Sequence, residues 1–261
     1  MTSPDRSNSR IYFLVSGIAV IAYAGLIEWI WGWATIFEQW SNWSLTSTLI
    51  ALMLMFCTYL VRAYRIRDYF RDYSRVCFSE SIRITLIHNL ANNLLPMRSG
   101  EASFPLMMRS SFDLPLSMTT GTLLFFRVLD LQVLLALGAI AWIWQLHSNL
   151  IGWSAWVVFV LSPFILIQGR TFIESKILVL LPRKLEELSK KILSGTPQSF
   201  DPLIRTLVLT WLNWSTKIIV FAWILMSFAE LELVQAITGA MGGELSSVLP
   251  FHAPAGVGTY E

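Results

Sequence analysis

The sequence has few charged residues and few cysteines for its length. Asp, Glu, Lys and Arg make up 14% of the 261 residues, against about 25% in ordinary soluble domains. Hydrophobic residues make up 55%, and apolar runs of about 20 residues recur, which is the length that crosses a bilayer. This composition excludes a soluble globular domain. The net charge of +2 does not indicate a nucleic-acid partner, and Cys57 and Cys77 are too few for a disulfide framework.

Signatures of cofactor and metal chemistry are also missing. The sequence contains no Walker loop and no His/Cys metal spacing, and Gly256 and Gly258 lack the strand and helix context of a dinucleotide-binding fingerprint. Beyond Glu101 and Glu261, no residue stands out as an activated nucleophile or base. We therefore expect no cofactor, no metal and no enzymatic activity from this chain.

The apolar runs predict an all-α, polytopic membrane helix bundle. Spanning helices are expected at residues 11–31, 44–61, 116–145, 153–168 and 206–228. Pro163 is able to kink the fourth of these spans, and residues 104–112 are expected to form a short connecting segment. A cleaved signal peptide is the weaker alternative for the first run, because the run continues past the cleavage-like Ala22-Tyr23-Ala24.

The basic residues between these runs predict the topology. Five arginines between residues 62 and 75 mark that loop as cytoplasmic, which places the N-terminus inside as well. Segment 169–205 is basic and cytoplasmic for the same reason, while the loops at residues 35–43 and near His147 face outward. We interpret the arginine-rich loop as a topology signal in contact with anionic lipid, in preference to a catalytic element.

The cytoplasmic segment 170–205 is predicted to contain an amphipathic helix. Leu185, Leu188 and Ile192 share one helical face, with lysines on the other side. Pro182 is suited to start the helix and Gly195 to end it. Such a helix lies on anionic lipids of the inner leaflet or docks a partner, for example a lipid-modifying enzyme. Both alternatives stay open.

Two short apolar segments end at a proline. The first, residues 82–95, leads to Pro96. The second, residues 234–249, is expected to be interrupted by Gly239, Gly242 and Gly243 and leads to Pro250. Irregular backbone at membrane depth has to be buried in protein or line a wet cavity. The two segments enter from opposite sides of the membrane on the predicted topology. We therefore predict two broken re-entrant elements that form an inverted repeat and meet near the midplane.

Five charged side chains fall at predicted membrane depth. Each costs about 2.5–3.5 kcal/mol at the bilayer centre, so these side chains must face one another, water or a ligand. Arg127 and Asp130 are three residues apart on one helix and are expected to pair, as are Arg98 and Glu101. Lys217 is then left as a spare cation, which suits the phosphate of an anionic lipid headgroup.

Residues 92–101, then Arg127 and Asp130, then residues 249–261 together resemble the flippase-like membrane family. That family includes the membrane domain of lysylphosphatidylglycerol synthetases. The resemblance covers most of the chain and departs from the family at Ala255, where glycine is frequent. No soluble aminoacyl-transferase domain and no terminal helices follow, so we expect the chain to be incomplete at its C-terminus. The resemblance marks as functional Asn93, Pro96, Arg98, Gly100, Glu101, Arg127, Asp130, Pro254, Gly256, Gly258 and Glu261.

These observations predict a single integral domain of the cell membrane over residues 1–261 that moves an anionic phospholipid or polyprenyl-phosphate-linked headgroup between leaflets. A membrane-bound lipid or glycolipid transferase, or a non-catalytic partner of one, is the alternative. His88 and His252 remain open between a ligand or proton carrier and a hydrogen-bonded filler. The predicted substrate-binding residues are Asn93, Arg98, Glu101, Arg127, Asp130, Lys217, His252, Gly256, Gly258 and Glu261.

Overall fold

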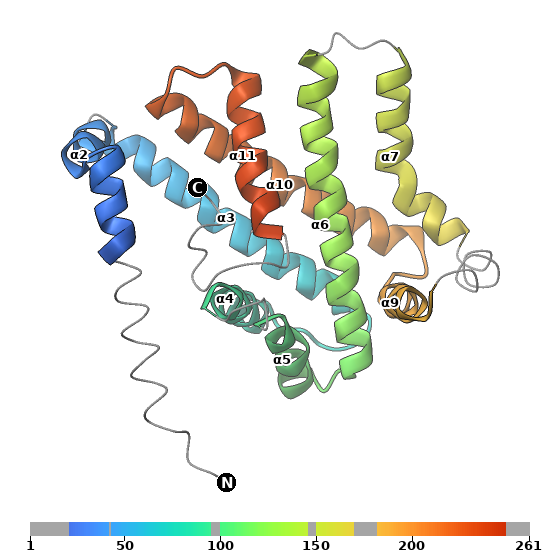
Figure 1. Cartoon of the computed structure of the whole chain (residues 1–261). Coiled ribbons are helices and arrows are strands. Elements are labelled where there is room, and N and C mark those ends of the chain that lie inside the picture. Colours follow the sequence, from blue (N-terminus) through green and yellow to red (C-terminus); the bar gives the residue numbers. More distant parts are fainter. Residues whose placement is uncertain (1–20, 42, 95–99, 146–149, 170–181, 249–261) are drawn as a thin grey trace. The chain divides into compact units, whose positions relative to one another are not determined.

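A computed structural model describes the chain outside residues 1–20, 42, 95–99, 146–149, 170–181 and 249–261 (Figure 1). Every extended regular element in this part is an α-helix, and the described residues contain no strand. Three helices are long and apolar enough to cross a membrane, over Leu45–Phe70, Leu116–Trp144 and Phe200–Phe228. The predicted all-α membrane helix bundle is therefore confirmed. The chain divides into two compact units, residues 1–50 and residues 51–261.

The first unit is described from residue 21 onward. An apolar helix, Ile21–Ile30, is followed by Gly32, whose φ of +75° turns the chain into α2 (Trp33–Ser41). The backbone N–H of Trp33 donates to the Glu28 carboxylate at 2.8 Å, which ties the turn to the preceding helix. Half of the predicted span over residues 11–31 lies outside the described residues. The external loop expected at residues 35–43 is instead largely helical.

The second unit begins within α3 (Leu45–Phe70), and α6 (Leu116–Gln145) lies at its centre. α6 has the predicted bounds and, in the described part of the chain, packs most closely against α5, α7, α9, α10 and α11. The helices that follow α3 and flank α6 are α4 (Phe78–Leu94), α5 (Ser103–Phe112), α7 (Leu150–Gln168), α9 (Arg183–Ser194), α10 (Phe200–Phe228) and α11 (Leu233–Val248).

Buried apolar side chains form two clusters along α6. One cluster joins α3, α5, α6 and α10 through side chains such as Phe70, Phe104 and Leu203. The other joins α6, α10 and α11 around Leu134, Trp214 and Met241. Lipid tails are as apolar as these side chains, so close packing, rather than removal from water, holds helices together in a membrane.

Several predicted boundaries are wrong. α3 was expected to end before Arg62, but it continues to Phe70. Neighbouring helices provide partners for arginine side chains in this part of α3, for example Asp130 for Arg65. The predicted connection at residues 104–112 is the helix α5. α10 begins at Phe200, with Asp201 and Pro202 in its first turn, where both residue types are favoured. The glycines expected to interrupt residues 234–249 lie inside α11.

Other predictions at this level are confirmed. Pro182 and Gly195 flank α9 at its N-cap and C-cap positions. Pro163 lies inside α7, and Figure 1 shows α7 bending in its C-terminal part.

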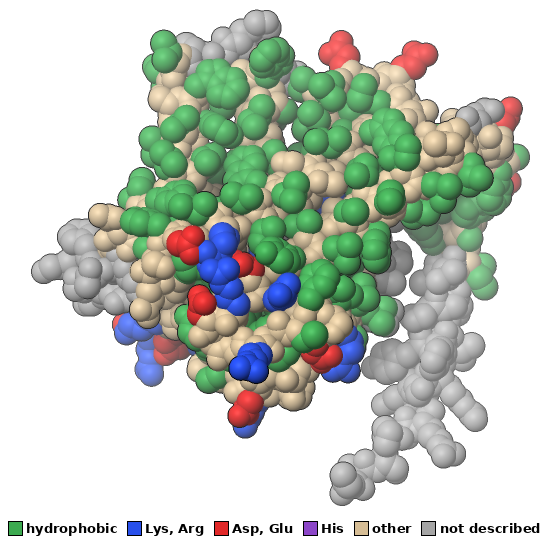
Figure 2. All heavy atoms as spheres, turned by 180° about the vertical axis from the view of Figure 1, so that it is seen from behind, with side chains coloured by type: hydrophobic (Ala, Val, Ile, Leu, Met, Phe, Trp, Pro, Cys, Tyr) green, Lys and Arg blue, Asp and Glu red, His purple; other side chains and the backbone are tan. Residues whose placement is uncertain are grey.

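Charged side chains are segregated on the molecular surface. In Figure 2, hydrophobic side chains cover most of the visible face, while lysine and arginine side chains gather in its lower part. Large apolar side chains such as Leu52, Val208 and Ile219 are more than half exposed. This distribution fits a protein whose solvent is the bilayer. The inverted repeat stays a prediction, because the turn after α11 lies outside the described residues.

Candidate functional site

Asp130 of α6 is buried and binds Arg65 of α3. Arg65 Nη1 donates to Asp130 Oδ1 at 2.7 Å, and Arg65 Nη2 donates to Oδ2 at 3.4 Å. α10 adds one contact to each partner: Arg65 Nη1 also donates to Thr210 Oγ1 at 2.8 Å, and Trp214 Nε1 donates to Asp130 Oδ1 at 3.0 Å. The two-pronged geometry is the strong form of a guanidinium–carboxylate pair, and it joins three helices.

The predicted pair between Arg127 and Asp130 is therefore wrong. Arg127 instead lies against Glu101, with 3.2 Å between Arg127 Nε and Glu101 Oε1 in an alignment that makes an ion pair but no hydrogen bond. A guanidinium from a facing helix reaches Asp130 with two nitrogens, which outcompetes a neighbour one turn away on the same helix. Arg98, the expected partner of Glu101, lies outside the described residues.

His88 of α4 connects this arginine to two further elements. His88 Nδ1 lies 3.2 Å from Ser103 Oγ of α5, and Nε2 lies 3.1 Å from Asn92 Nδ2. Arg127 Nη2 lies 3.5 Å from the same Nε2. His88 is buried, so these polar contacts hold α4, α5 and α6 together at one point. Of the roles left open for His88, hydrogen bonding is present, while ligand binding and proton transfer stay predictions.

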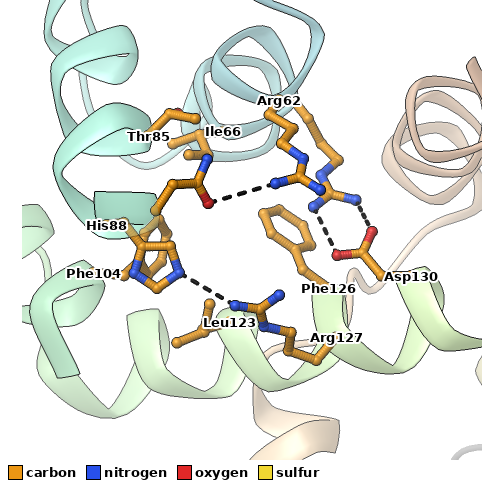
Figure 3. A pocket seen from close by; sticks show the side chains of 11 residues that line it. Arg62, Ile66, Thr85, His88, Phe104, Leu123, Phe126, Arg127 and Asp130 are labelled. Atoms are coloured by element: carbon orange, nitrogen blue, oxygen red, sulfur yellow. Dashed lines mark hydrogen bonds and ion pairs between the residues drawn. The ribbon is translucent and has the colours of Figure 1, made fainter. Parts of the chain in front are cut away.

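A cavity of about 50 Å³ lies among these side chains, which is room for a few water molecules (Figure 3). Three buried polar atoms around it lack a hydrogen-bond partner among the described residues: Arg65 Nε, Asn89 Nδ2 and Arg127 Nε. Buried polar atoms are normally paired, so their concentration here indicates a wet or ligand-binding cavity. We call this the arginine cavity; it is lined by Arg62, Arg65, Ile66, Thr85, His88, Asn89, Phe104, Leu123, Phe126, Arg127 and Asp130.

Among the described residues, Arg62 is the cation of this cavity that forms no ion pair with an acidic side chain. Arg62 Nη1 donates to Asn89 Oδ1 at 3.5 Å, and its guanidinium lies 5.6 Å from the centre of the Trp214 ring. No ion pair joins Arg62 to another residue in the described part of the chain. Both of its direct contacts are uncharged, and the nearby carboxylates of Asp130 and Glu244, which attract its charge, are ion-paired with Arg65 and Lys217.

Lys217, in contrast, is not the spare cation that the sequence predicted. Lys217 Nζ of α10 lies 2.7 Å from Glu244 Oε1 and 2.7 Å from Glu244 Oε2. Glu244 belongs to α11 and is buried. The ammonium group also lies 5.1 Å from the Trp214 ring centre and 5.6 Å from that of Phe221. A carboxylate and two aromatic faces thus stabilise this lysine.

The family model of the lysylphosphatidylglycerol synthase TM region matches residues 14–261 of the chain. The chain belongs to this family. No curated protein and no solved structure matches it. Membership confirms the resemblance drawn from the motifs. It makes this chain a multi-pass membrane protein of a family with a membrane-lipid-related function.

The structure of this family member brings together only part of the predicted site. Glu101, Arg127 and Asp130 lie at or beside the arginine cavity. Lys217 lies in a separate ion pair, and Asn93 is exposed and does not line the cavity. Five predicted site residues lie outside the described residues: Arg98, His252, Gly256, Gly258 and Glu261.

Sequence reasoning missed Arg62, Arg65 and Glu244. The arginines were assigned to a cytoplasmic loop because basic residues after an apolar run usually mark its end. The spacing of three residues between Arg62 and Arg65 could have indicated a shared site, because it places both side chains on one face of a continuing helix. Glu244 was missed because the two glycines before it were interpreted as a break. A lone acid in an apolar helix is itself a signal of a buried cation partner.

Proposed function

We propose that this chain moves an anionic phospholipid or polyprenyl-phosphate-linked headgroup between the two leaflets, and that the arginine cavity receives the headgroup. The observation that supports this most directly is Arg62, a cation beside a polar cavity without an acidic partner among the described residues.

The charges around the cavity favour an anion. Asp130 neutralises Arg65, and Glu101 neutralises Arg127. The positive charge of Arg62 is then in excess. Arg62 lies eight residues before Phe70, so it is roughly 12 Å inside the end of α3. A charged side chain deep in the bilayer costs about 2.5–3.5 kcal/mol, and an anionic ligand offsets this cost.

A phosphate group is the anion that this site suits best. Guanidinium groups bind phosphate with two parallel hydrogen bonds, and the free N–H groups of Arg62, with Arg65 Nε, are the donors available here. Arg127 Nε already faces Glu101 in an ion pair. The cavity of about 50 Å³ is too small for a whole headgroup, so α3, α4 and α6 have to separate for it to pass. The acyl chains can remain in the bilayer while the headgroup moves.

Reconstitution into liposomes tests the proposal. The purified chain is inserted into vesicles that contain fluorescent phosphatidylglycerol, and movement is followed by quenching the label in the outer leaflet. We expect the wild-type chain alone to move the lipid, which neither a transferase nor a non-catalytic partner would do. Arg62→Gln removes the unneutralised charge and should abolish the movement.

Arg67→Gln is the matched control, because Arg67 lies on the same helix but is exposed and does not line the cavity. This variant should move lipid at the wild-type rate. Equal rates for wild type and Arg62→Gln would place the headgroup elsewhere in the molecule. Vesicles in which the wild-type chain moves no lipid would overturn the transport proposal itself.

A further inference from the structure

A second cavity lies on the side of α6 opposite the arginine cavity. Its volume is about 290 Å³, and its walls are formed by side chains of α6, α7 and α9. α6 turns Arg127 and Asp130 toward the arginine cavity, whereas Val128, Leu131 and Leu135 line the second one. We call this second cavity the α6–α7 groove. The two sites are therefore separated by the helix itself.

The bend of α7 at Pro163 opens the groove. Proline has no N–H, so the carbonyl of Phe159, four residues earlier, lacks its helical partner. Gln132 Nε2 of α6 donates to this carbonyl at 2.8 Å and lies 3.1 Å from Ser162 Oγ. One turn before Phe159, Trp156 Nε1 donates to Ala136 O of α6 at 2.8 Å. α7 is thus bound to α6 before the bend and diverges from α6 after it (Figure 1).

The groove suits a hydrocarbon chain. Its walls carry side chains such as Leu131, Leu135 and Phe159, and its floor is closed by Ile192 and Leu193 of α9. From Phe125 to Leu135 the lining residues extend over roughly 15 Å along α6. α6 is long and apolar enough to cross the membrane, so hydrocarbon is the medium that meets its outward face.

α9, which closes the floor of the groove, carries two lysines, Lys184 and Lys191, that lie outside the lining of the groove. On α9, Arg183 pairs with Glu187 and Lys190 pairs with Glu186. No ion pair joins Lys184 or Lys191 to another residue of the described chain. These two lysines are seven residues apart, which places them on one side of α9. On a helical projection they border the apolar sector that contains Ile192, and lysines bordering such a sector extend toward lipid phosphates.

We propose that the α6–α7 groove binds one acyl chain of an anionic phospholipid whose phosphate lies against Lys184 and Lys191. The apolar walls recognise the chain, and the two lysines of α9 select an anionic headgroup that lies outside the groove. This lipid stays bound to the protein and differs from a lipid that passes through the arginine cavity. The inference is independent of the transport proposal.

Native mass spectrometry of the detergent-solubilised chain tests the charge selection. The chain is mixed with equal amounts of phosphatidylglycerol and phosphatidylcholine that carry the same acyl chains. We expect wild type to retain one phosphatidylglycerol in preference to phosphatidylcholine. The double variant Lys184→Gln with Lys191→Gln should lose about twenty-five-fold in affinity for phosphatidylglycerol, since each lysine near an anionic lipid contributes on the order of five-fold.

The double variant Arg183→Gln with Lys190→Gln is the matched control. It removes the same net charge at the same spacing, but from residues that already pair with glutamates. Its loss of affinity should be clearly smaller. Equal losses in both double variants, or equal retention of both lipids by wild type, would overturn the assignment of the phosphate to Lys184 and Lys191.

Tryptophan substitutions test the groove. Ser162→Trp and Val128→Trp each fill it from a different wall, so one variant still serves if the other fails to fold. Both should lose the retained phosphatidylglycerol while keeping wild-type helicity by circular dichroism. Val208→Trp is the control, because Val208 is 59% exposed on α10 and does not line the groove. Wild-type lipid retention in a folded groove variant would overturn the proposal.

Discussion

The ion pairs at and beside the arginine cavity join side chains from different elements. Asp130 of α6 binds Arg65 of α3, and Glu244 of α11 binds Lys217 of α10. Pairs of this kind are costly to bury, and breaking one costs more than replacing both partners. At the scale of the residue, they therefore specify which helices lie next to each other more than they add stability.

A double-mutant comparison checks the partner of Asp130. Asp130→Asn leaves the buried Arg65 charge unpaired, and we expect it to lower the stability of the folded chain by about 3–5 kcal/mol. Adding Arg65→Gln should recover part of this loss, because no unpaired charge remains. Adding Arg127→Gln should recover nothing. Thermal unfolding of the three variants in detergent gives the comparison.

The opposite pattern of rescue would contradict this assignment of the partner of Asp130. If Arg127→Gln rescues Asp130→Asn and Arg65→Gln does not, Asp130 pairs with Arg127 along its own helix and does not pair with Arg65.

The sequence alone identified Arg127 and Asp130 as site residues but could not assign their partners. Spacing along one helix is visible in a sequence, whereas the reach of Arg65 across to α6 depends on how α3 packs. Arg62 and Arg65 also carried a competing signal, because arginines after an apolar run ordinarily mark a cytoplasmic loop. The same limit hid Glu244, whose partner Lys217 lies 27 residues earlier in the chain.

At the scale of the element, the C-terminal end of α9 packs against α6 with the two backbones in close contact. A Cβ atom at Gly195 would overlap the backbone of Gly121 and Thr122. The Tyr69 hydroxyl of α3 donates a hydrogen bond to the Gly195 carbonyl at the same place. The sequence predicted α9 correctly from Pro182, Gly195 and the apolar face. It assigned Gly195 only to ending the helix and could not show the contact with α6.

Gly195→Ala should therefore undock α9. The added methyl group has no space, and overpacking of this kind costs about 1–3 kcal/mol. We expect faster hydrogen exchange and faster proteolysis in α9, with little change in α10 and α11. Gly242→Ala is the matched control, because a Cβ atom there meets nothing within 4 Å. The control should be neutral or stabilising by about 0.5–1 kcal/mol, as expected for alanine replacing glycine inside a helix.

Unchanged protection of α9 in Gly195→Ala would mean that the helix is not anchored at this glycine. The floor of the α6–α7 groove would then not be fixed to α6 through this contact.

At the scale of the whole molecule, the predicted topology rests on the distribution of basic residues. The family and the apolar helices make the chain a multi-pass membrane protein, whereas the side of the membrane on which each loop lies stays a prediction. The structure offers a native reporter for it. Cys77 is a free, exposed cysteine between α3 and α4, two residues after the arginine-rich region 62–75 that is expected to be cytoplasmic.

The hydrogen bonds of Cys77 favour its deprotonated form. Hydrogen bonds from the Ser79 hydroxyl, and from the backbone N–H groups of Ser79 and Glu80, lower its pKa below the ordinary value. The thiolate is the reacting species, so a lowered pKa keeps the group reactive at pH values where an ordinary thiol is protonated. Ser79→Ala removes the hydroxyl contact and raises the pKa again. Labelling should then be slower near neutral pH, while the side of the membrane from which Cys77 reacts stays the same.

An impermeant maleimide added to intact cells should therefore leave the chain unlabelled and should label it after permeabilisation. Cys77→Ser should remove this signal, because Cys57 lies in the membrane-spanning helix α3, away from a water-soluble reagent. In the Cys77→Ser background, a cysteine at Ser148 should react from outside and one at Ser189 only after permeabilisation. These outcomes follow from the positive-inside rule applied to residues 62–75 and 169–205. Labelling of Cys77 in intact cells would invert the topology and would move the lysines of α9 to the outer leaflet.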